Sequence, residues 1–491
     1  MKILKCARLL FDCFNSNDVK YCHWKSNERL LDGLNAENKT DLDILVSFKD
    51  KKRIEVHFEN CKYKKLKSPD NLDNPNMEGW IALDEETGKF VYVHLHYKII
   101  AGHKKMREYD LPWTDLALDT RIHYPNTDIY VMEPNLELVT LYTRIALTFL
   151  SRKKNKISKG IVEKDQKEIN YLKHYVSWDK VKLILKTYFG SDSQNILELI
   201  KKEKLSHKEL TQLILIIKKT SVNYRNRGKI SIAFFKFFYF TLRIKRVFLN
   251  RFLKKFSITK KVLFNKKGLM VAFVGQDGAG KSTITKEISE WLSWKFDAKK
   301  IYLGVGDGYF SWQKKKISWI GNKKGIYEII KKMLFISMFI ARSKLSNRIL
   351  KKSKKFVNNG GIIVFDRFPQ MQFEGLYDGP KVKNYSTAYF NKRNINSKLL
   401  TALMNFLARR EEKFLEKSVK QNPDLVIKLI LPPEVSIDRK PYQDFNEIIK
   451  KHEITKQLTF ENSTVHTIDA SKNYEEEMIE IKKILWQNMQ S

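Results

Sequence analysis

A glycine-rich segment in the second half of the chain carries residue types that bind phosphate. Residues 269–283 read LMVAFVGQDGAGKST, so an apolar run is followed by the spacing G-x-x-x-x-G-K-S. Glycines let backbone N–H groups face a phosphate chain, the lysine can reach the outer phosphates, and the serine hydroxyl can ligate Mg²⁺. A strand before the segment and a helix after it favour this function over a chance turn. The predicted nucleotide-binding residues are Gly275, Asp277, Gly278, Ala279, Gly280, Lys281, Ser282 and Thr283.

A pair of carboxylates near the start of the chain could also do chemistry. Residues 40–46 read TDLDILV, an alternation that places Asp41 and Asp43 on one face of a strand. Adjacent carboxylates repel each other unless a divalent cation or a cationic side chain lies between them. The pattern therefore predicts a metal site with Asp41 and Asp43 as ligands, or an ordinary strand edge with surface acids.

The elements that must position the phosphate-binding segment follow from hydrophobic periodicity. From residue 267 onward apolar runs alternate with helical patterns, which predicts an α/β domain whose parallel sheet is flanked by helices. Strands are expected at residues 269–274, 301–305, 362–365, 425–431 and 465–468. Ligands bind at the carboxyl ends of such strands, and Asp366 and Arg367 follow the third one.

These motifs together resemble the thymidylate kinase family. The family's D-G-A-G-K-S/T loop is matched at residues 277–283, its D-R-Y motif at residues 366–368, and its PDL-strand-PxE-helix-Arg run at residues 423–439. The resemblance covers residues 268–491 and implies a P-loop kinase fold, ATP as phosphate donor and Mg²⁺ as the metal.

The resemblance also implies roles for individual side chains. Phosphoryl transfer requires negative charge to be neutralised and two phosphates to be held in line. Lys281 and Arg439 are expected at the donor phosphates, and Arg367 is expected to bind the acceptor phosphate in a bidentate manner. Asp366 is expected to hold Mg²⁺ together with Ser282, or to orient the acceptor. The alternative for Asp366 and Arg367 is a strand-end ion pair.

Two departures from the family concern the acceptor. Phe368 replaces the tyrosine of D-R-Y, and residues 370–382, which include DGPKV, do not resemble the family's thymine-binding helix. Arg342 or Arg348 is similar in place to the family's second acceptor arginine, although a solvated basic face is the alternative. The acceptor is therefore expected to be dTMP or another small phosphorylated molecule.

The first part of the chain resembles the nucleotidyltransferase superfamily. There a serine-bearing turn precedes D-x-D, as Ser26 precedes Asp41 and Asp43 here. The superfamily's third carboxylate comes from a later strand, but His94 occupies that position in residues 90–96. The resemblance implies an α+β fold, and the missing carboxylate leaves nucleotidyl transfer open because two-metal catalysis needs the third ligand.

The two parts in this order are similar to thymidylate-kinase-like proteins encoded with bacterial capsule and other surface-polysaccharide genes. The shared segments are HWKSN at residues 23–27, TDLDILV at residues 40–46, and DRFP followed by DGP at residues 366–380. This resemblance implies a kinase outside housekeeping nucleotide metabolism, whose acceptor is either dTMP or another phosphorylated small molecule such as a sugar or lipid intermediate of envelope synthesis.

Four parts are expected along the chain. They are a nucleotidyltransferase-like α+β domain (1–130), a helical extension (131–220), a basic amphipathic connector (221–266) and a thymidylate kinase-like domain (267–491). Within the connector, residues 230–255 mix phenylalanines with Lys and Arg and contain no acid. This composition is typical of a helix on anionic lipid, or of helices packed between domains. Nucleic-acid binding is disfavoured because the aromatic residues cluster instead of interleaving.

Composition sets wider bounds on the function. The formal net charge of +37 indicates an anionic partner, although lysines spread over solvated faces account for much of it. The four cysteines form no C-x-x-C pair, which favours reduced thiols in a cytoplasmic protein. No apolar run is long enough to span a bilayer. The N-terminal apolar stretch predicts a helix and not a signal peptide. We expect a cytoplasmic protein that the connector can place at the inner membrane face.

The sequence thus predicts an ATP- and Mg²⁺-dependent kinase that acts on a small phosphorylated acceptor. Two alternatives stay open: a nucleotide-gated binding protein at the membrane face, and a bifunctional kinase and nucleotidyltransferase. A homodimer is expected only by analogy with thymidylate kinases.

Overall fold

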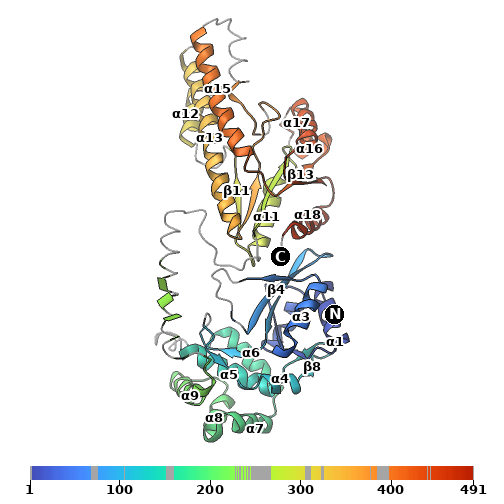
Figure 1. Cartoon of the computed structure of the whole chain (residues 1–491), viewed down its shortest axis with the longest axis vertical. Helices are drawn as coiled ribbons and strands as arrows, with labels where there is room; N and C mark the ends of the chain where they lie inside the picture. The colour runs from blue at the N-terminus through green and yellow to red at the C-terminus, as the bar shows by residue number, and fades with distance from the viewer. Residues whose placement is uncertain are drawn as a thin grey trace. The chain divides into compact units, whose positions relative to one another are not determined.

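The chain forms two compact units, Met1–Phe248 and Leu249–Ser491, which are described separately (Figure 1). The computed structural model describes residues 3–67, 74, 76–103, 106–150, 160–226, isolated positions between 228 and 244, 267–304, 311–321, 326–375, 378–383, 398–439, 441–442 and 444–489. Most of residues 230–255, the predicted lipid-binding stretch, lies outside these ranges. Among the described helices, none has both the length and the apolar character to cross a bilayer.

The first unit is built on a seven-stranded mixed sheet of order β3-β4-β5-β2-β1-β9-β8. Its strands are β1 (Tyr21–His23), β2 (Leu42–Val46), β3 (Lys64–Leu66), β4 (Met77–Asp84), β5 (Lys89–His96), β8 (Ile122–His123) and β9 (Tyr130–Val131). β2 pairs in parallel with β5, so that Asp43 lies opposite His94. The strand expected at 40–46 begins at Leu42, and Asp41 lies immediately before it.

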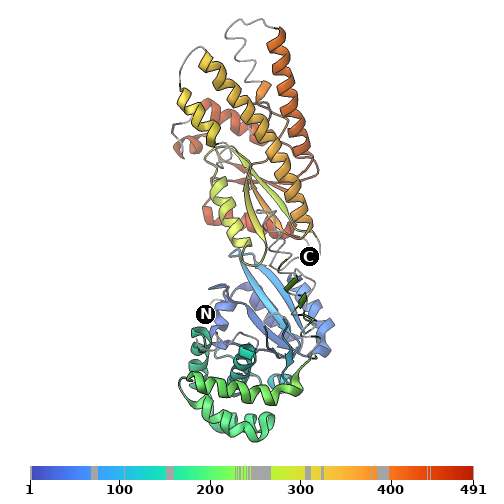
Figure 2. The same cartoon turned by 90° about the vertical axis from the view of Figure 1, so that its left-hand side faces the viewer.

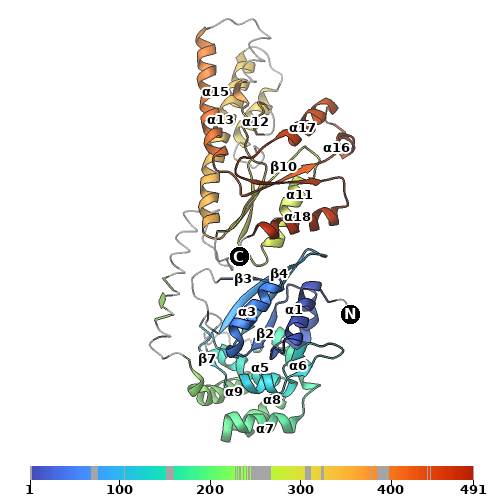
Figure 3. The same ribbon diagram turned by 45° about the vertical axis from the view of Figure 1, so that its right-hand side comes forward.

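Helices α1 (Lys5–Ser16) and α3 (Lys51–Asn60) pack together against this sheet (Figure 3). α1 buries Leu10 and Phe14, and α3 buries Phe58, whose ring stacks on Trp80 with centroids 4.8 Å apart. The predicted first helix is therefore confirmed, and its apolar face is used in the core. All four cysteines are unpaired, as expected.

The helices after β9 share a core with the sheet. They are α5 (Pro134–Leu150), α6 (Glu163–Lys173), α7 (Trp178–Phe189), α8 (Ser193–Lys201) and α9 (His207–Thr220). Their buried residues form one cluster with Cys22, Trp24 and Leu45 of the sheet region. α9 begins with a capping box in which Ser206 and Glu209 satisfy each other's backbone N–H groups.

The second unit contains a five-stranded sheet of order β11-β12-β10-β13-β14, in which every pairing is parallel. The strands are β10 (Met270–Gly275), β11 (Ala298–Tyr302), β12 (Ile362–Asp366), β13 (Leu425–Ile430) and β14 (Thr464–Asp469). All five predicted strands are present. β11 begins three residues before the predicted 301–305, because an edge strand tolerates the half-buried Lys299 and Lys300.

Helices cover this sheet and extend past it (Figures 1 and 2). They are α11 (Lys281–Leu292), α12 (Ser311–Ile320), α13 (Ile326–Asn358), α15 (Lys398–Val419), α16 (Pro433–Arg439), α17 (Phe445–Gln457) and α18 (Tyr474–Asn488). The C-terminal part of α13 packs Leu350, Phe356 and Val357 on Phe365 and its strand neighbours. Its N-terminal part runs beside α12 and α15.

Phe365 should be a principal contributor to the stability of the second unit, because its ring is 0% exposed on β12, an inner strand of the sheet. We expect Phe365→Ala to lower the free energy of unfolding by about 3–5 kcal/mol through lost burial and a residual cavity. Phe406→Ala is the matched control, since that ring is 59% exposed, and it should cost less than about 0.5 kcal/mol. Urea denaturation monitored by circular dichroism checks both. Equal effects would contradict the assigned core.

Candidate functional site

The phosphate-binding segment forms a tight loop between β10 and α11. Gly278 (φ +90°) and Gly280 (φ +75°) adopt the left-handed conformations that glycine permits without strain. At Gly275 a Cβ atom would lie 2.6 Å from the backbone oxygen of Leu429, so a side chain does not fit. The predicted glycines are thus required by the path of the chain.

Lys281 is held over the loop by the loop itself. Its Nζ donates hydrogen bonds to the carbonyl oxygens of Gly275 and Gln276, both at 2.7 Å. Gln276 is buried, and its amide donates to the Leu431 carbonyl of the neighbouring β13 end. The lysine therefore lies at the place where an anion bound by the loop would need it.

Ser282 and Asp366, the two predicted Mg²⁺ ligands, are in direct contact. The Ser282 hydroxyl donates to Oδ2 of Asp366 at 2.6 Å. Asp366 is 2% exposed, and its Oδ1 has no hydrogen-bond partner among the described residues. Lys300 lies beside the pair, with Nζ 3.7 Å from the same Oδ2, and donates to the Ser282 carbonyl at 2.7 Å.

This donor set fits Mg²⁺. The ion prefers hard oxygen ligands and is commonly bound by one or two protein groups, with waters and substrate phosphates completing its shell. Within the described ranges, no group of three or more His, Cys, Asp or Glu side chains is arranged to hold a metal. The Ser282 hydroxyl and the Asp366 carboxylate next to the phosphate loop are consistent with a site of this kind, in which the protein supplies few of the Mg²⁺ ligands.

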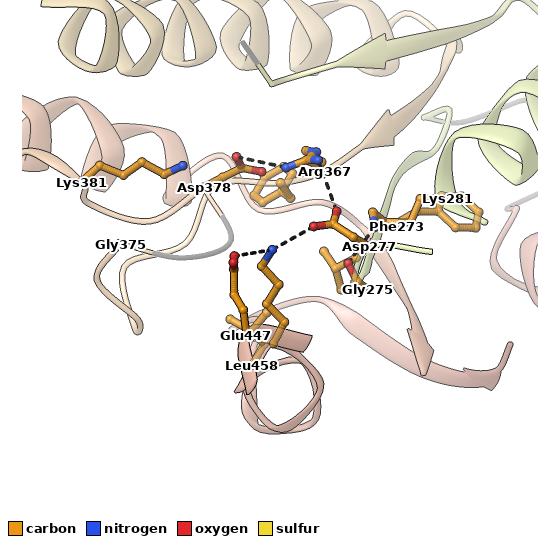
Figure 4. Close-up of a pocket in the computed structure, with 13 residues that line it drawn as sticks. Phe273, Gly275, Asp277, Lys281, Arg367, Gly375, Asp378, Lys381, Glu447 and Leu458 are labelled. Carbon is orange, nitrogen blue, oxygen red and sulfur yellow. Dashed lines mark hydrogen bonds and ion pairs between the residues drawn. The ribbon is translucent and has the colours of Figure 1, made fainter. Parts of the chain in front are cut away.

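A pocket lies next to the loop, and Arg367 lies inside it between two carboxylates (Figure 4). One terminal nitrogen of Arg367 is 3.8 Å from Asp277 Oδ1, and the other is 4.0 Å from Asp378 Oδ1. Burial works against the charge, but Asp378, Tyr302 and Asp277 outweigh it and raise the pKa of Arg367. Its backbone is left-handed (φ +82°), which costs free energy for a non-glycine residue and is common at functional sites.

Asp277 is neutralised from a second side by α17. Nζ of Lys451 lies 2.9 Å from Asp277 Oδ2 and 2.7 Å from Glu447 Oε1. Burial alone would raise the pKa of Asp277, but Lys451, Lys281 and Arg367 together lower it to about 2. Asp277 is consequently charged at any physiological pH.

Asp378 connects the pocket to α13. A terminal nitrogen of Arg342 donates to Asp378 Oδ1, and Nε of Arg342 donates to the Leu303 carbonyl at 3.2 Å. Of the two arginines considered for the acceptor, buried Arg342 reaches this site, whereas Arg348 is exposed. Lys381 also lines the pocket, and burial lowers its pKa.

Arg439 lies on the outer side of the loop. It donates to the carbonyl oxygens of Gly278 (3.2 Å) and Ala470 (3.4 Å), and it is exposed. The structure therefore brings together Lys281, Ser282, Asp366 and Arg367, with Arg439 as a support of the loop. Sequence reasoning missed Lys300 and Lys451; the Glu447–Lys451 spacing of four on a helix was the only local signal for the latter.

In the first unit, the cation beside Asp43 is a lysine. Nζ of Lys25 lies 2.8 Å from Asp43 Oδ1, and His96 Nε2 lies 3.2 Å from the same oxygen. His94 Nδ1 is 3.5 Å from Asp43 and 3.8 Å from Asp41. Burial raises the pKa of Asp43, but Lys25 and the two histidines bring it well below its usual value. Burial lowers the pKa of His96 to about 3, so this ring is neutral at pH 7.

The proposed Mg²⁺ ligation by Asp41 and Asp43 stays a prediction. The repulsion between these two carboxylates is relieved by a nearby cation, either a metal ion or a side chain. Lys25 meets that requirement for Asp43 within the fold itself. The nucleotidyltransferase-like assignment of this unit likewise stays a prediction.

Lys451 is one of the cations that lower the pKa of Asp277, so its removal should raise that pKa. We expect Lys451→Met to move the pKa of Asp277 from about 2 toward the ordinary value of about 3.9. Because the folded pKa lies below the unfolded one, the pair stabilises the fold above pH 4, and this contribution is lost as the pH falls through about 2. NMR titration of ¹³C-labelled Asp carboxyls measures the change. Lys450→Met, one position along α17 and exposed, is the control and should leave Asp277 unmoved.

Removing Lys25 should destabilise the first unit. Lys25→Met leaves Asp43 buried without its ammonium partner, and we expect a loss of about 3 kcal/mol in unfolding free energy. The double variant Lys25→Met/Asp43→Asn should recover most of it. Lys20→Met removes an exposed ion pair with Asp119 and should cost less than about 1 kcal/mol. A Mg²⁺-dependent rise in wild-type Tm that Asp43→Asn abolishes would instead support the metal site.

Comparisons with known proteins extend these observations. No protein-family model matches the chain. It is 25% identical over 230 residues to "Uncharacterized ATP-binding protein YghR" of Escherichia coli K12, covering 44% of this chain and 85% of the relative. It is 25% identical over 224 residues to a "Probable thymidylate kinase" of Archaeoglobus fulgidus, covering 44% of this chain and 94% of the relative.

Solved structures of deoxyadenosine kinase from M. mycoides also match. The complex with dATP is 19% identical, covers 44% of this chain and 98% of the kinase chain, and has a TM-score of 0.28. At that score the likeness carries no argument about fold or substrate. The two sequence relatives, together with the loop, the Ser282–Asp366 contact and Arg367, support a phosphotransferase of the P-loop kinase type in this chain.

Proposed function

We propose that this chain is an ATP-dependent kinase that transfers the γ-phosphate to dTMP or another small phosphorylated acceptor. The observation that carries the proposal is the contact of Ser282 with Asp366 at 2.6 Å, beside the phosphate loop and next to Arg367. The donor loop, two Mg²⁺ ligands and a cation for the acceptor thus meet at one end of the sheet. The relatives named as an ATP-binding protein and a thymidylate kinase support ATP as the donor and a nucleotide-like acceptor.

The donor side follows from the loop. Its N–H groups and the first turn of α11 bind the phosphates, and Lys281 exchanges its two carbonyl partners for phosphate oxygens. Ser282 and Asp366 hold Mg²⁺, which neutralises charge on the donor phosphates. Lys300, next to Asp366, limits the net negative charge around the Ser282–Asp366 pair.

The acceptor side follows from the arginines. Arg367 is flanked by Asp277 and Asp378 and Arg342 is paired with Asp378, so each guanidinium is already oriented when an acceptor phosphate arrives. A doubly charged phosphate competes with these carboxylates, because charge-assisted contacts to phosphate are among the strongest hydrogen bonds. In this arrangement the two arginines bind the acceptor phosphate, and residues near Asp378 contact the rest of the acceptor.

The departures in residues 370–382 bear on which acceptor is used. A sugar or lipid intermediate of surface-polysaccharide synthesis is the proposed class beyond dTMP, and the resemblance to proteins encoded with such genes supports it. Magnesium dependence, a homodimer and attachment to the inner membrane face through residues 230–255 stand as parts of this proposal. For the first unit, the Lys25–Asp43 pair favours a structural role over a second transferase activity.

Phosphate transfer from γ-labelled ATP tests the proposal with a panel of acceptors: dTMP, other nucleoside monophosphates, sugar phosphates and a membrane lipid extract. Wild-type protein should label one class in a Mg²⁺-dependent manner. Lys281→Ala should lower the rate by at least about 100-fold, because a cation is lost where charge develops. The matched control is Lys286→Ala, an exposed lysine on the same helix, which should keep the wild-type rate.

The result for each acceptor decides between the readings. Transfer to dTMP alone makes the chain a thymidylate kinase with an added unit, whereas transfer to a sugar or lipid fraction supports the envelope role. ATP binding without transfer to any acceptor would contradict the kinase proposal in favour of a nucleotide-gated binding protein. An unchanged rate of phosphate transfer in Lys281→Ala would show that this lysine of the loop does not act in the reaction.

A further inference from the structure

Two neighbouring helices of the second unit expose large aromatic side chains that its core does not use. Trp312 and Trp319 of α12 are 58% and 68% exposed, and Tyr327, Ile330 and Met333 of α13 are also exposed. These residues, with Lys315 and Lys316, are here called the tryptophan face. Figures 1 and 2 show α12 beside the part of α13 that extends past the sheet.

Helical spacing places the residues of each helix on one side. Trp312 and Trp319 are seven residues apart, and Lys315 and Lys316 lie three or four residues from both, so the four side chains share one face of α12. Lys316 Nζ lies 4.2 Å from the centroid of the Trp312 ring. On α13, Tyr327, Ile330 and Met333 recur every three residues.

The two helices present these faces together. The rings of Trp319 and Tyr327 meet edge to face with centroids 6.5 Å apart, and Lys331 of α13 donates to the Gly321 carbonyl at the end of α12. Further along its length, α13 packs against α15, and Ile336 is buried there with Met404 and Ala408 of α15. The tryptophan face is therefore apolar surface left over after the helices have packed.

Charge indicates what this face contacts. The described residues 311–321 and 326–333 contain five lysines and one acid, Glu328, which pairs with Lys332. Two copies of so basic a surface would repel each other, which argues against self-association. Nucleic acid would match the charge but would leave Ile330 and Met333 exposed without a partner. An anionic lipid surface satisfies both features, because Trp and Tyr rings settle at the headgroup level, aliphatic side chains enter the acyl boundary, and lysines meet the phosphates.

We propose that the tryptophan face docks the second unit on an anionic lipid surface. This site is separate from the predicted one at residues 230–255, and it rests on neither the kinase proposal nor the identity of the acceptor. α13 also carries Arg342, fifteen residues beyond Tyr327, which is about 22 Å along a helix. The same helix therefore links the tryptophan face to Asp378, which Arg342 contacts.

Co-sedimentation of the full chain with lipid vesicles tests the docking. Wild-type protein should bind phosphatidylglycerol–phosphatidylcholine vesicles, should bind pure phosphatidylcholine vesicles weakly, and should release as salt rises. Lys315→Glu/Lys316→Glu should weaken binding by about 30-fold, from two lost lysines at the lipid surface. Trp312→Ser/Trp319→Ser should weaken binding without removing charge.

The matched control reverses the same number of charges on α13, away from the tryptophan face. Lys351→Glu/Lys352→Glu changes two exposed lysines near the other end of that helix and should leave vesicle affinity within about threefold. Circular dichroism and Tm confirm that every variant folds; all the substituted side chains are exposed, so both values should match wild type.

Four results would overturn the proposal. Equal losses of affinity in the lysine variant of α12 and in the control variant of α13 would reduce the effect to net charge. Full vesicle binding by both α12 variants would leave lipid contact to the connector. A wild-type dimer that Trp312→Ser/Trp319→Ser converts to monomer in analytical ultracentrifugation would assign the face to a second copy of the chain. Duplex DNA that displaces vesicles from the wild-type protein but not from the α12 variants would assign the face to nucleic acid.

Discussion

The Asp277 carboxylate lies between Lys451 on one side and Arg367 on the other, and this balance of charge governs the pocket. A phosphate-binding loop collects cations, and cations that crowd without counterions repel one another and lower each other's charge. Asp277 and Asp378 supply those counterions while no phosphate is bound. The guanidinium of Arg367 is therefore oriented before substrate arrives, and the left-handed backbone of Arg367 is compensated by these contacts.

The parallel sheet explains how residues far apart in sequence reach this point. β10 lies between β12 and β13, and Phe273 is in register with Asp366, so the loop after β10 meets the end of β12 directly. The same edge receives Leu431, whose carbonyl accepts from Gln276, at the end of β13. Strand order thus places the loop after β10, the Asp366 carboxylate and Arg367 together, and the helices α13 and α17 then add Arg342 and Lys451 around them.

The parts of the site that the sequence predicted are those encoded by local spacing. Gly275 to Thr283 form a contiguous pattern, and Asp366 and Arg367 follow an apolar strand whose end must lie at the ligand edge. Lys451 and Lys300 escaped prediction because an isolated lysine on an amphipathic helix or an edge strand looks like solvated surface until the packing is known. In the first unit the sequence showed that Asp43 needed a cation, but only the antiparallel pairing of β1 with β2 brings Lys25 to it.

The continuity of α13 limits how the length of this helix can change. The helix runs unbroken over 33 residues, with the exposed Tyr327, Ile330 and Met333 in its first turns and Arg342 in its middle. Inserting one residue between them would rotate the two parts relative to each other by about 100°, since 3.6 residues complete a turn. Seven residues make nearly two turns and restore the alignment at a greater separation. Changes of length in this segment therefore keep both ends of the helix aligned only when they come close to whole turns, as seven, eleven or eighteen residues do, so the segment is under a phase constraint as well as a packing constraint.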